Sequence, residues 1–180
     1  MRDSEERVIL VDEDDRDLGT MDKLEAHRKG LLHRAISIFV FDGEGRVLLQ
    51  RRAMGKYHCP GLWANTCCSH PRPGETPLAA AHRRLPEELG FDCELSFVGK
   101  VLYRAPVGGD LIEHELVSAF AGRAPAGLTP EPDPSEVMET RLLDPLDLRR
   151  EVAEHPERFA PWLRIYVEQH FDVLFAQPVA

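Results

Sequence analysis

The sequence predicts a single α/β (α+β) domain in which a mixed β-sheet lies between helices. The first indication is composition, because 43% of the 180 residues are hydrophobic and 29% are charged, which suits one globular domain with a sizeable core. The second is the succession of short apolar segments and amphipathic segments with helical spacing. No internal repeat or low-complexity tract divides the chain, so we assign residues 1–180 to one domain.

The first half of the chain is predicted to contain three strands and a short helix. The strands are expected at residues 7–11, 35–42 and 46–52. Gly43-Glu44-Gly45 is a turn, so the second and third strands should form a hairpin. Residues 22–29 are predicted as a helix or turn that ends at Gly30. Residues 53–75 have many Gly, Pro, His and Cys residues without a clean period, which predicts a functional loop.

The second half begins with a clearly delimited helix. Thr76 is a capping residue, Pro77 suits the first helical position, and Gly90 ends a segment with apolar residues at helical spacing. Strands are expected at residues 93–103, 111–123 and 137–142, and amphipathic helices at residues 144–154 and 157–174. Residues 124–134 contain four prolines and are predicted as a loop.

The charge balance restricts the class of partner. Lys and Arg total 22 and Asp and Glu total 31, which gives a formal net charge of −9. An acidic chain is poorly suited to nucleic acid or an anionic membrane, although a local basic pocket can still hold a small anion. No apolar run approaches the ~20 residues of a membrane span, and residues 1–7 are too polar for a signal peptide. We therefore expect a cytoplasmic protein without membrane insertion.

The four cysteines are expected to be thiols rather than disulfides in such a protein. Cys59, beside a proline, and Cys93, in an apolar segment, are interpreted as core residues. Cys67 and Cys68 are adjacent, so in an extended chain their side chains point in opposite directions. Cys68 then lies on the same side as His70.

Two glutamates lie in the strand predicted at residues 111–123. Glu113 and Glu115 are two positions apart, so both side chains point to the same face. An isolated Glu-x-Glu is most often a solvated strand face. Here the same face also presents Leu111, Val117 and Ala119, and paired carboxylates in an apolar setting remain ionised only if a cation compensates them. A bound metal ion is the simplest such cation.

Three histidines near turns offer nitrogen donors to the same ion. His27 and His33 flank the turn at Gly30, and His70 follows the cysteine pair. A single histidine is more often structural or exposed than a metal ligand. Three imidazoles and two carboxylates together suit Zn²⁺, Mn²⁺ or Fe²⁺ better than Mg²⁺.

The segment from Ser69 to Phe91 resembles a degenerate Nudix box. The matching positions are Glu75, Arg83, Leu85, Glu87, Glu88 and Gly90. At three other positions Ser69 replaces a Gly, Arg84 replaces a Glu and Phe91 replaces an aliphatic residue. Surface ion pairs along a helix would explain the charges but not the complete spacing. The resemblance implies a Nudix-type mixed β-sheet sandwiched between helices. Nudix hydrolases use the Glu that Arg84 replaces to bind catalytic Mg²⁺.

Four further motifs resemble one family with this fold, the type I isopentenyl diphosphate isomerases. They are Gly30-Leu31-Leu32-His33-Arg34-Ala35, Arg51-Arg52-Ala53, Asn65-Thr66-Cys67-Cys68-Ser69-His70-Pro71 and Glu113-His114-Glu115. The resemblance extends from Val8 to about Trp162. It implies an isomerase that interconverts isopentenyl and dimethylallyl diphosphate. Such an enzyme protonates an alkene to a tertiary carbocation and removes a proton from a neighbouring carbon.

The resemblance implies acid/base roles for Cys68 and Glu115. Tyr103 would hydrogen-bond to one of these groups, and the face of Trp162 would stabilise the cation. A thiol has an unperturbed pKa of about 8.5 and can be tuned toward neutrality by its surroundings. For Cys68 and Trp162 the alternative is plain core packing.

The resemblance also implies one divalent ion, Mn²⁺ or Zn²⁺, in a site of His and Glu residues. Its ligands would be His27, His33, His70, Glu113 and Glu115, with an N-terminal extension, about residues 1–33, completing the site. Glu88 would contact a Mg²⁺ ion that accompanies the substrate diphosphate. The basic residues expected to hold that diphosphate are Lys23, Arg52, Lys56 and Arg84. The alternative for these side chains is a solvated charged surface.

Two other functions remain open from the sequence. A Nudix hydrolase of a nucleoside diphosphate derivative would use the same box, although Arg84 counts against it. A metal-binding module without enzymatic activity is disfavoured, because the cysteines lack the paired spacing of closed zinc sites. The sequence leaves the native metal open, and also whether the chain is a monomer or a homodimer.

Overall fold

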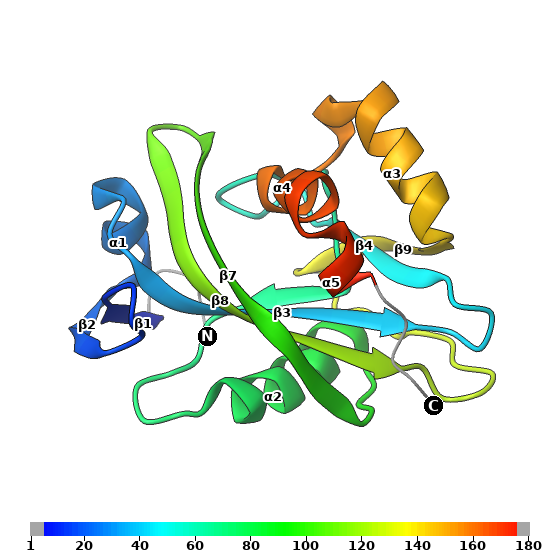
Figure 1. The fold of residues 1–180 in the computed structure, drawn as a ribbon, viewed down its shortest axis with the longest axis horizontal. Coiled ribbons are helices and arrows are strands. Elements are labelled where there is room, and N and C mark those ends of the chain that lie inside the picture. The colour runs from blue at the N-terminus through cyan, green and yellow to red at the C-terminus, as the bar shows by residue number, and fades with distance from the viewer. Residues whose placement is uncertain (1–5, 176–180) are drawn as a thin grey trace.

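Nine strands form one mixed sheet with helices on both faces in the computed structural model, which describes residues 6–175 (Figure 1). The strands are β1 (Arg7–Val11), β2 (Asp17–Asp22), β3 (His33–Phe41), β4 (Val47–Arg52), β5 (Trp63–Ala64), β6 (Cys67–Ser69), β7 (Leu95–Gly108), β8 (Leu111–Arg123) and β9 (Val137–Leu143). The helices are α1 (Lys23–Lys29), α2 (Pro77–Leu89), α3 (Pro145–Glu154), the 3-10 turn η2 (Pro156–Arg158), α4 (Pro161–Gln169) and α5 (Phe171–Leu174). The predicted fold class is confirmed.

The parallel pairing of β3 with β8 forms the centre of the sheet. Nine consecutive residue pairs join the two strands, beginning with His33 opposite Glu115. On its other edge β8 pairs antiparallel with β7, and there Tyr103 lies opposite Glu115. The other edge of β3 pairs with β6, which puts Cys68 opposite Ser37. The register therefore gathers residues from distant parts of the chain into neighbouring positions.

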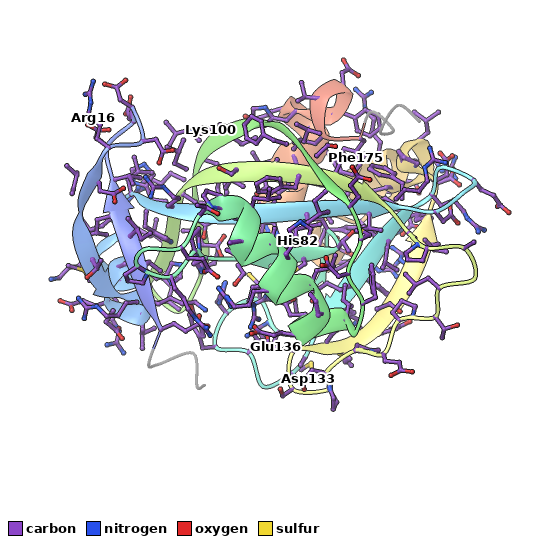
Figure 2. All side chains as sticks on the ribbon, turned by 90° about the horizontal axis from the view of Figure 1, so that it is seen from below. Arg16, His82, Lys100, Asp133, Glu136 and Phe175 are labelled. Carbon is purple, nitrogen blue, oxygen red and sulfur yellow. The ribbon has the colours of Figure 1, made fainter. Side chains whose placement is uncertain are left out.

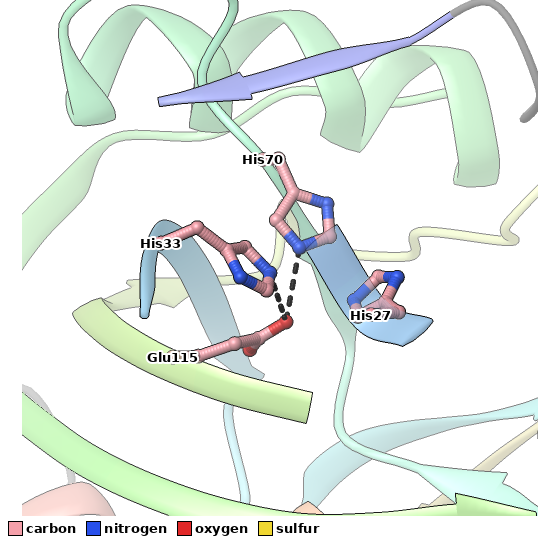
Figure 3. A group of neighbouring side chains, drawn as sticks. All are labelled: His27, His33, His70 and Glu115. Atoms are coloured by element: carbon pink, nitrogen blue, oxygen red, sulfur yellow. Dashed lines mark hydrogen bonds and ion pairs between the residues drawn. The ribbon is translucent and has the colours of Figure 1, made fainter. Parts of the chain in front are cut away.

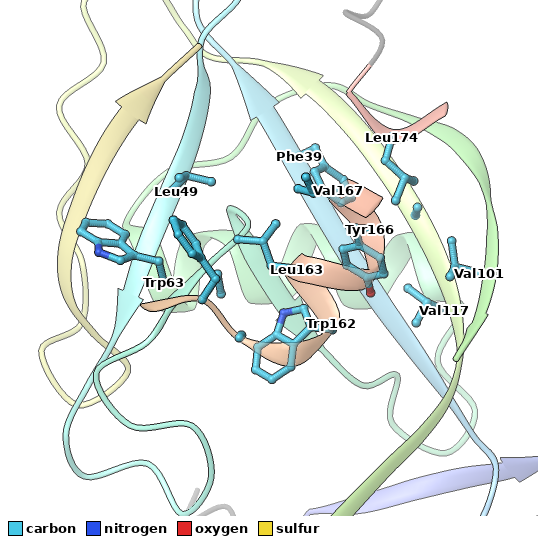
Figure 4. Packing of buried hydrophobic residues seen from close by; sticks show 14 of the residues in the cluster. Phe39, Leu49, Trp63, Val101, Val117, Trp162, Leu163, Tyr166, Val167 and Leu174 are labelled. Atoms are coloured by element: carbon cyan, nitrogen blue, oxygen red, sulfur yellow. The ribbon is translucent and has the colours of Figure 1, made fainter. Parts of the chain in front are cut away.

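Two separate apolar cores hold the helices against the sheet. On one face α3, α4 and α5 cover the core that contains Phe39 and Leu163 (Figure 4). On the other face α2 lies across the sheet, and Leu85 packs in the core that contains Ile38 (Figure 2). Fully burying a side chain of this size stabilises the fold by roughly 1.5–3 kcal/mol. Neighbouring residues of β3 enter different cores, as the two-residue period of a strand requires.

Helix α2 has the start and stop signals that the sequence predicts. The Thr76 hydroxyl accepts a hydrogen bond from the Ala79 amide, and Pro77 occupies the first turn. Gly90 ends the helix with a left-handed φ of 76°. The helix continues through Pro86, whose carbonyl accepts the Gly90 amide.

One prediction is confirmed only in part and another is wrong. The hairpin expected over residues 35–52 is reduced to the single pair Phe41–Val47, because β3 pairs with β6 and β8 while β4 pairs with β5 and β9. The helix expected over residues 157–174 is divided into η2, α4 and α5. Pro161 lies in the first turn of α4, which is where a new helix accommodates a proline.

Smaller differences concern edge strands and one cysteine. β2 was not expected, and the loop predicted at residues 53–75 contains the two short strands β5 and β6. β7 continues to Gly108, beyond the predicted end. Cys59 is buried as predicted, whereas Cys93 precedes β7 and is only half-buried. The loop predicted at residues 124–134 and the strand predicted at residues 111–123 are confirmed.

The chain ends are only partly covered by the structure. Residues 1–5, part of the segment considered above for a signal peptide, lie outside the described residues. Within residues 6–175, no helix has both the length and the apolar composition needed to cross a membrane.

Replacing Gly90 with Ala is expected to destabilise the protein by about 1–3 kcal/mol. A Cβ atom there would lie 2.7 Å from the Glu131 carbonyl oxygen, in addition to the cost of a positive φ. Urea denaturation measures the effect. The control is Gly43→Ala, where a Cβ meets nothing within 4 Å, and its stability should stay within about 0.5 kcal/mol. Equal stability of the two variants would contradict the assignment of strain to Gly90.

Candidate active site and metal centre

Three histidines and one glutamate converge at one end of the sheet (Figure 3). They are His27 from α1, His33 from the start of β3, His70 just after β6 and Glu115 from β8. One ligand atom from each of the four lies within 4.8 Å of the others. Of the predicted ligands, the structure thus brings together these four.

The sheet register and one turn explain this convergence. His33 and Glu115 are direct partners in the β3–β8 ladder, so their side chains lie side by side. Gly30, in a left-handed conformation with φ 61°, ends α1 and reverses the chain between His27 and His33. The two rings are 5.0 Å apart between centroids, and that of His70 is 5.1 Å from His33.

In His27 and His33, one ring nitrogen is hydrogen-bonded and the other, Nε2, remains available to a ligand. His33 Nδ1 lies 2.8 Å from the Leu31 carbonyl oxygen and must donate to it, which leaves Nε2 with a lone pair. His27 Nδ1 lies 2.9 Å from the Tyr57 hydroxyl. Among the described residues, neither His27 Nε2 nor His33 Nε2 has a hydrogen-bond partner. The nearest carboxylate oxygen to His33 Nε2 is Glu115 Oε1, at the longer distance of 3.5 Å (Figure 3).

Buried nitrogen atoms without partners fit a bound cation. An unsatisfied buried acceptor costs about 1–3 kcal/mol, and coordination removes that cost. Histidine ligands of metals characteristically donate their other N–H to a carbonyl or a similar acceptor, as His33 does here. The four-residue group therefore suits a divalent transition metal.

Burial gives this cluster unusual protonation equilibria. Burial and the neighbouring imidazoles of His70 and His33 lower the pKa of His27 to about 2. Burial also lowers the pKa of His70 below its usual range. Burial alone would raise the pKa of Glu115, but the imidazoles of His33 and His70 outweigh it and hold that pKa well below its usual range. Burial therefore favours the neutral form of His27 and His70, while Glu115 is ionised at neutral pH.

The two glutamates point to the same face and are both buried, as the strand period predicts. The Tyr103 hydroxyl lies 2.8 Å from Glu113 Oε2 and 2.7 Å from Glu115 Oε2. His70 Nε2 lies 2.9 Å from Glu115 Oε1, whereas His58 Nε2 lies 2.8 Å from Glu113 Oε1. Tyr103 thus bridges the Oε2 atoms of the two carboxylates. The Oε1 atom of Glu115 contacts His70, and that of Glu113 contacts His58.

Cys68, in β6, has polar side chains around its thiol. Its thiol donates to Asn65 Oδ1 at 3.0 Å and lies 3.4 Å from the Ser37 hydroxyl. That hydroxyl is 2.8 Å from the Tyr166 hydroxyl. Cys67 points to the opposite face, into the core beneath α2, so the predicted difference between the two cysteines is confirmed.

Desolvation raises the pKa of Cys68 to about 12, although its hydrogen bonds with Ser37 and Asn65 act in the opposite direction. The pKa near neutrality considered from the sequence is therefore not found in the metal-free protein. Cys68 holds its proton at neutral pH, while Glu115 does not. One group that can give a proton and one that can take it line the same cavity.

The cavity between these groups is small. Its volume is about 40 Å³, roughly the space of one water molecule in the liquid. Besides Cys68 and Glu115, its lining includes Tyr103, Glu113, Trp162 and Tyr166, and all four predicted basic residues, Lys23, Arg52, Lys56 and Arg84. A larger ligand can enter only if side chains of the lining move.

Acidic side chains accompany the basic ones in this lining. Glu6 lies 3.0 Å from Lys23, and Glu136 lies 2.8 Å from Lys56. Arg84 lies 2.7 Å from Glu88, which also accepts a hydrogen bond from Gln50. Glu88 and Arg84 of the Nudix-box segment are therefore paired with each other inside the cavity.

Trp162 is buried and also lines the cavity. The Arg52 guanidinium lies 5.2 Å from its ring centroid, and His58 lies 5.9 Å from it. Within the described part of the chain, Trp162 Nε1 has no hydrogen-bond partner. Trp162 therefore packs in the apolar core, which was the alternative considered from the sequence, and it also lines the cavity.

Sequence reasoning missed several polar residues of this site. The missed side chains are Glu6, Ser37, Gln50, Tyr57, His58, Asn65, Glu136 and Tyr166. His58 and Tyr57 lie next to the predicted Lys56, and Asn65 is part of the motif with Cys68, so proximity in sequence was an available signal. The others approach the site only through strand pairing or helix packing.

The metal-free protein is expected to lose stability as the pH falls below about 6.5. An unfolded histidine titrates near pH 6.5, while folded His27 stays neutral down to about pH 2, so the unfolded state binds more protons in between. Each such histidine adds up to about 1.4 kcal/mol per pH unit.

Urea denaturation in the presence of a chelator, from pH 7.5 to 5, measures this slope. That window lies above the titration of ordinary carboxylates. The slope should be shallower in His27→Gln, whereas His155→Gln, at an exposed site at the end of α3, should leave it nearly unchanged. A flat profile in the wild type would contradict the neutral buried imidazoles.

Solved structures with the same fold come from several organisms. A structure from Deinococcus radiodurans has a TM-score of 0.76 at 23% sequence identity and covers 91% of this chain and 98% of its own. The MutT protein from Methanosarcina mazei has a TM-score of 0.63 at 17% identity, covering 78% of this chain and 93% of its own. At these identities the likeness establishes the fold alone.

Sequence relatives are closer. Residues 31–163 match the NUDIX domain. The protein called isopentenyl-diphosphate Delta-isomerase in Cereibacter sphaeroides (strain KD131) is 58% identical over 87% of this chain and 89% of its own length. The protein of the same name in Burkholderia multivorans is 52% identical over 92% of this chain and 93% of its own. This chain therefore belongs to the isopentenyl-diphosphate Delta-isomerase family of NUDIX domain proteins.

Proposed function

We propose that this enzyme interconverts isopentenyl diphosphate and dimethylallyl diphosphate, with Cys68 and Glu115 as its acid/base groups. The observation that supports this most strongly is that a protonated thiol and an ionised carboxylate line one small cavity. Moving a double bond by one carbon requires a proton to be added at one carbon and removed from a neighbouring one. Cys68 and Glu115 supply one group for each of these transfers.

Tyr103 and Trp162 support the two transfers in this proposal. The Tyr103 hydroxyl lies between the two glutamates, so it orients the Glu115 carboxylate toward the cavity. Trp162 presents an aromatic face, which is worth roughly 2 kcal/mol or more to a desolvated cation. Most of the lining side chains are buried, and a lining closed around the substrate would keep bulk water away from a carbocation that would otherwise react with it.

The metal site in this proposal consists of His27, His33, His70 and Glu115, with Glu113 as a fifth ligand. The donor set favours Mn²⁺ or Zn²⁺ over Mg²⁺. When bound, the ion would neutralise the buried carboxylate charge and fix the orientation of Glu115. The N-terminal extension, about residues 1–33 of the single domain 1–180, completes the site because it provides His27.

The diphosphate is assigned to the basic side chains of the cavity. Lys23, Arg52, Lys56 and Arg84 all line it and would bind the phosphate oxygens by charge-assisted hydrogen bonds. Glu6 and Glu136 now neutralise two of these side chains, so the diphosphate would take the place of their carboxylates. Glu88, beside Arg84, would contact a Mg²⁺ ion that accompanies the diphosphate.

A hydrolase of nucleoside diphosphate derivatives is not favoured. Arg84 stands where the Nudix box has a Glu that binds Mg²⁺, and its guanidinium pairs with Glu88. The acidic composition argues against a nucleic-acid partner. The proposal includes a cytoplasmic enzyme that is a monomer or a homodimer.

Cys68→Ala and Glu115→Gln should each lower kcat for isomerisation by about 10²–10⁴-fold, the usual contribution of a general acid or base. The assay measures allylic diphosphate formation, and deuterium incorporation into isopentenyl diphosphate in D₂O, by the metal-loaded protein. Circular dichroism should show an unchanged fold.

The matched control is Cys67→Ala, because Cys67 lies in the core beneath α2 and should leave isomerisation intact. Near-normal activity of Cys68→Ala would refute the assigned mechanism. A wild type that forms no allylic product and exchanges no deuterium would refute the proposed activity itself.

A further inference from the structure

His58 lies inside the site but has no part in the mechanism above. It belongs to the segment between β4 and β5, is buried, and lines the cavity. Its ring lies 4.4 Å from that of Tyr57 and 5.9 Å from that of Trp162, measured between centroids. Its Nε2 atom lies 2.8 Å from Glu113 Oε1.

The tautomer of His58 follows from these contacts. A hydrogen bond at 2.8 Å requires a hydrogen between Nε2 and Oε1, and the carboxylate accepts it when Nε2 carries that hydrogen. The opposite tautomer would put a lone pair against the carboxylate. It would also bury an N–H at Nδ1, which has no partner among residues 6–175. His58 is therefore a hydrogen-bond donor to Glu113.

Backbone contacts fix this donor in place. The Arg52 guanidinium donates to the His58 carbonyl oxygen, at 3.1 Å from Nη2. The next residue, Cys59, is buried and its thiol donates to the Val107 carbonyl near the tip of the β7–β8 hairpin. The segment that contains His58 is thus tied both to β4 and to the strand opposite Glu113.

The hydrogen bond from His58 matters because the two glutamates share one other donor, the hydroxyl of Tyr103. Tyr103 has one hydroxyl hydrogen and two carboxylate oxygens within 2.8 Å, Oε2 of Glu113 and Oε2 of Glu115. It can donate to only one of them at a time. Without His58, Glu113 would have only Tyr103 as a donor at that distance among the described residues, and the two buried carboxylates would compete for it.

We propose that His58 is a positioning residue whose Nε2–H holds Glu113 and leaves the Tyr103 hydroxyl proton to Glu115. This inference rests on the proposed function, in which Glu115 is an acid/base group. His58 acts through Glu113 and Tyr103, so its removal should slow the proton transfers more than it weakens substrate binding. A histidine that only filled space between Tyr57 and Trp162 would act through its ring and not through its N–H.

Two substitutions separate these roles. His58→Phe keeps an aromatic ring without the donor, whereas His58→Gln keeps an N–H near the position of Nε2 without the ring. His58→Phe should lower kcat about 10–100-fold, the usual effect of removing a hydrogen-bond partner of a site ligand, with KM for isopentenyl diphosphate nearly unchanged. His58→Gln should recover most of kcat.

A double-mutant cycle tests whether His58 acts through Glu113. If it does, His58→Phe should cost much less in a Glu113→Gln background than in the wild type. Additive losses would overturn the proposal, and so would a His58→Gln variant as impaired as His58→Phe. If His58→Phe does not fold, His58→Asn replaces it in both comparisons, because the shorter Asn side chain cannot place an N–H at the position of Nε2.

A measurement of Zn²⁺ affinity by competition with a fluorescent chelator does not depend on activity. His58→Phe should bind Zn²⁺ about 10-fold or more weakly, and His58→Gln should restore the affinity. Unchanged affinity in His58→Phe would overturn the assigned role. An inactive wild type would refute the proposed isomerase reaction, while this affinity comparison would still decide the role of His58.

Discussion

The β7–β8–β3 register is the constraint on which the site depends. Tyr103, Glu115 and His33 lie in one row across these three strands, because Glu115 is the direct partner of both others. Residues in one row of a sheet point to the same face and lie within contact distance. A shift of one position would turn Glu115 to the opposite face and dissolve the site. The two apolar cores fix that register, because a shifted strand would expose its buried side chains.

The site contains more buried polar groups than a stable core would accept without compensation. Two carboxylates, four imidazoles and a phenol are packed together, and several imidazole nitrogens have no partner among the described residues. Such an arrangement costs stability in the metal-free protein. It is consistent with a site whose favourable state includes a cation.

The Nudix-box segment has a structural part and a cavity part. Arg83 binds Glu75 at 2.8 Å and also donates to the His70 carbonyl at 3.3 Å, so it anchors the loop that presents His70. Arg84 and Glu88 instead face the cavity, where they pair with each other. Helix α2 thus has two roles. Arg83 holds the loop that presents His70, and Arg84 and Glu88 line the cavity.

The sequence by itself determined the fold class, the six longer strands other than β2, and α2. It also determined that Glu113 and Glu115 point to the same face, because period, caps and turns act over a few residues. It also indicated His27, His33 and His70 as a group through motif resemblance, although their distance from one another was not determined. Only the tertiary structure decided the partners of β3 and β4, the division of the C-terminal helix, and the positions of Ser37, His58 and Tyr166 in the site. These depend on contacts between residues far apart in the chain, and no local pattern encodes which strand edge or helix face will meet another. The raised pKa of Cys68 was also decided by the tertiary structure, because desolvation by surrounding elements outweighs the local hydrogen bonds.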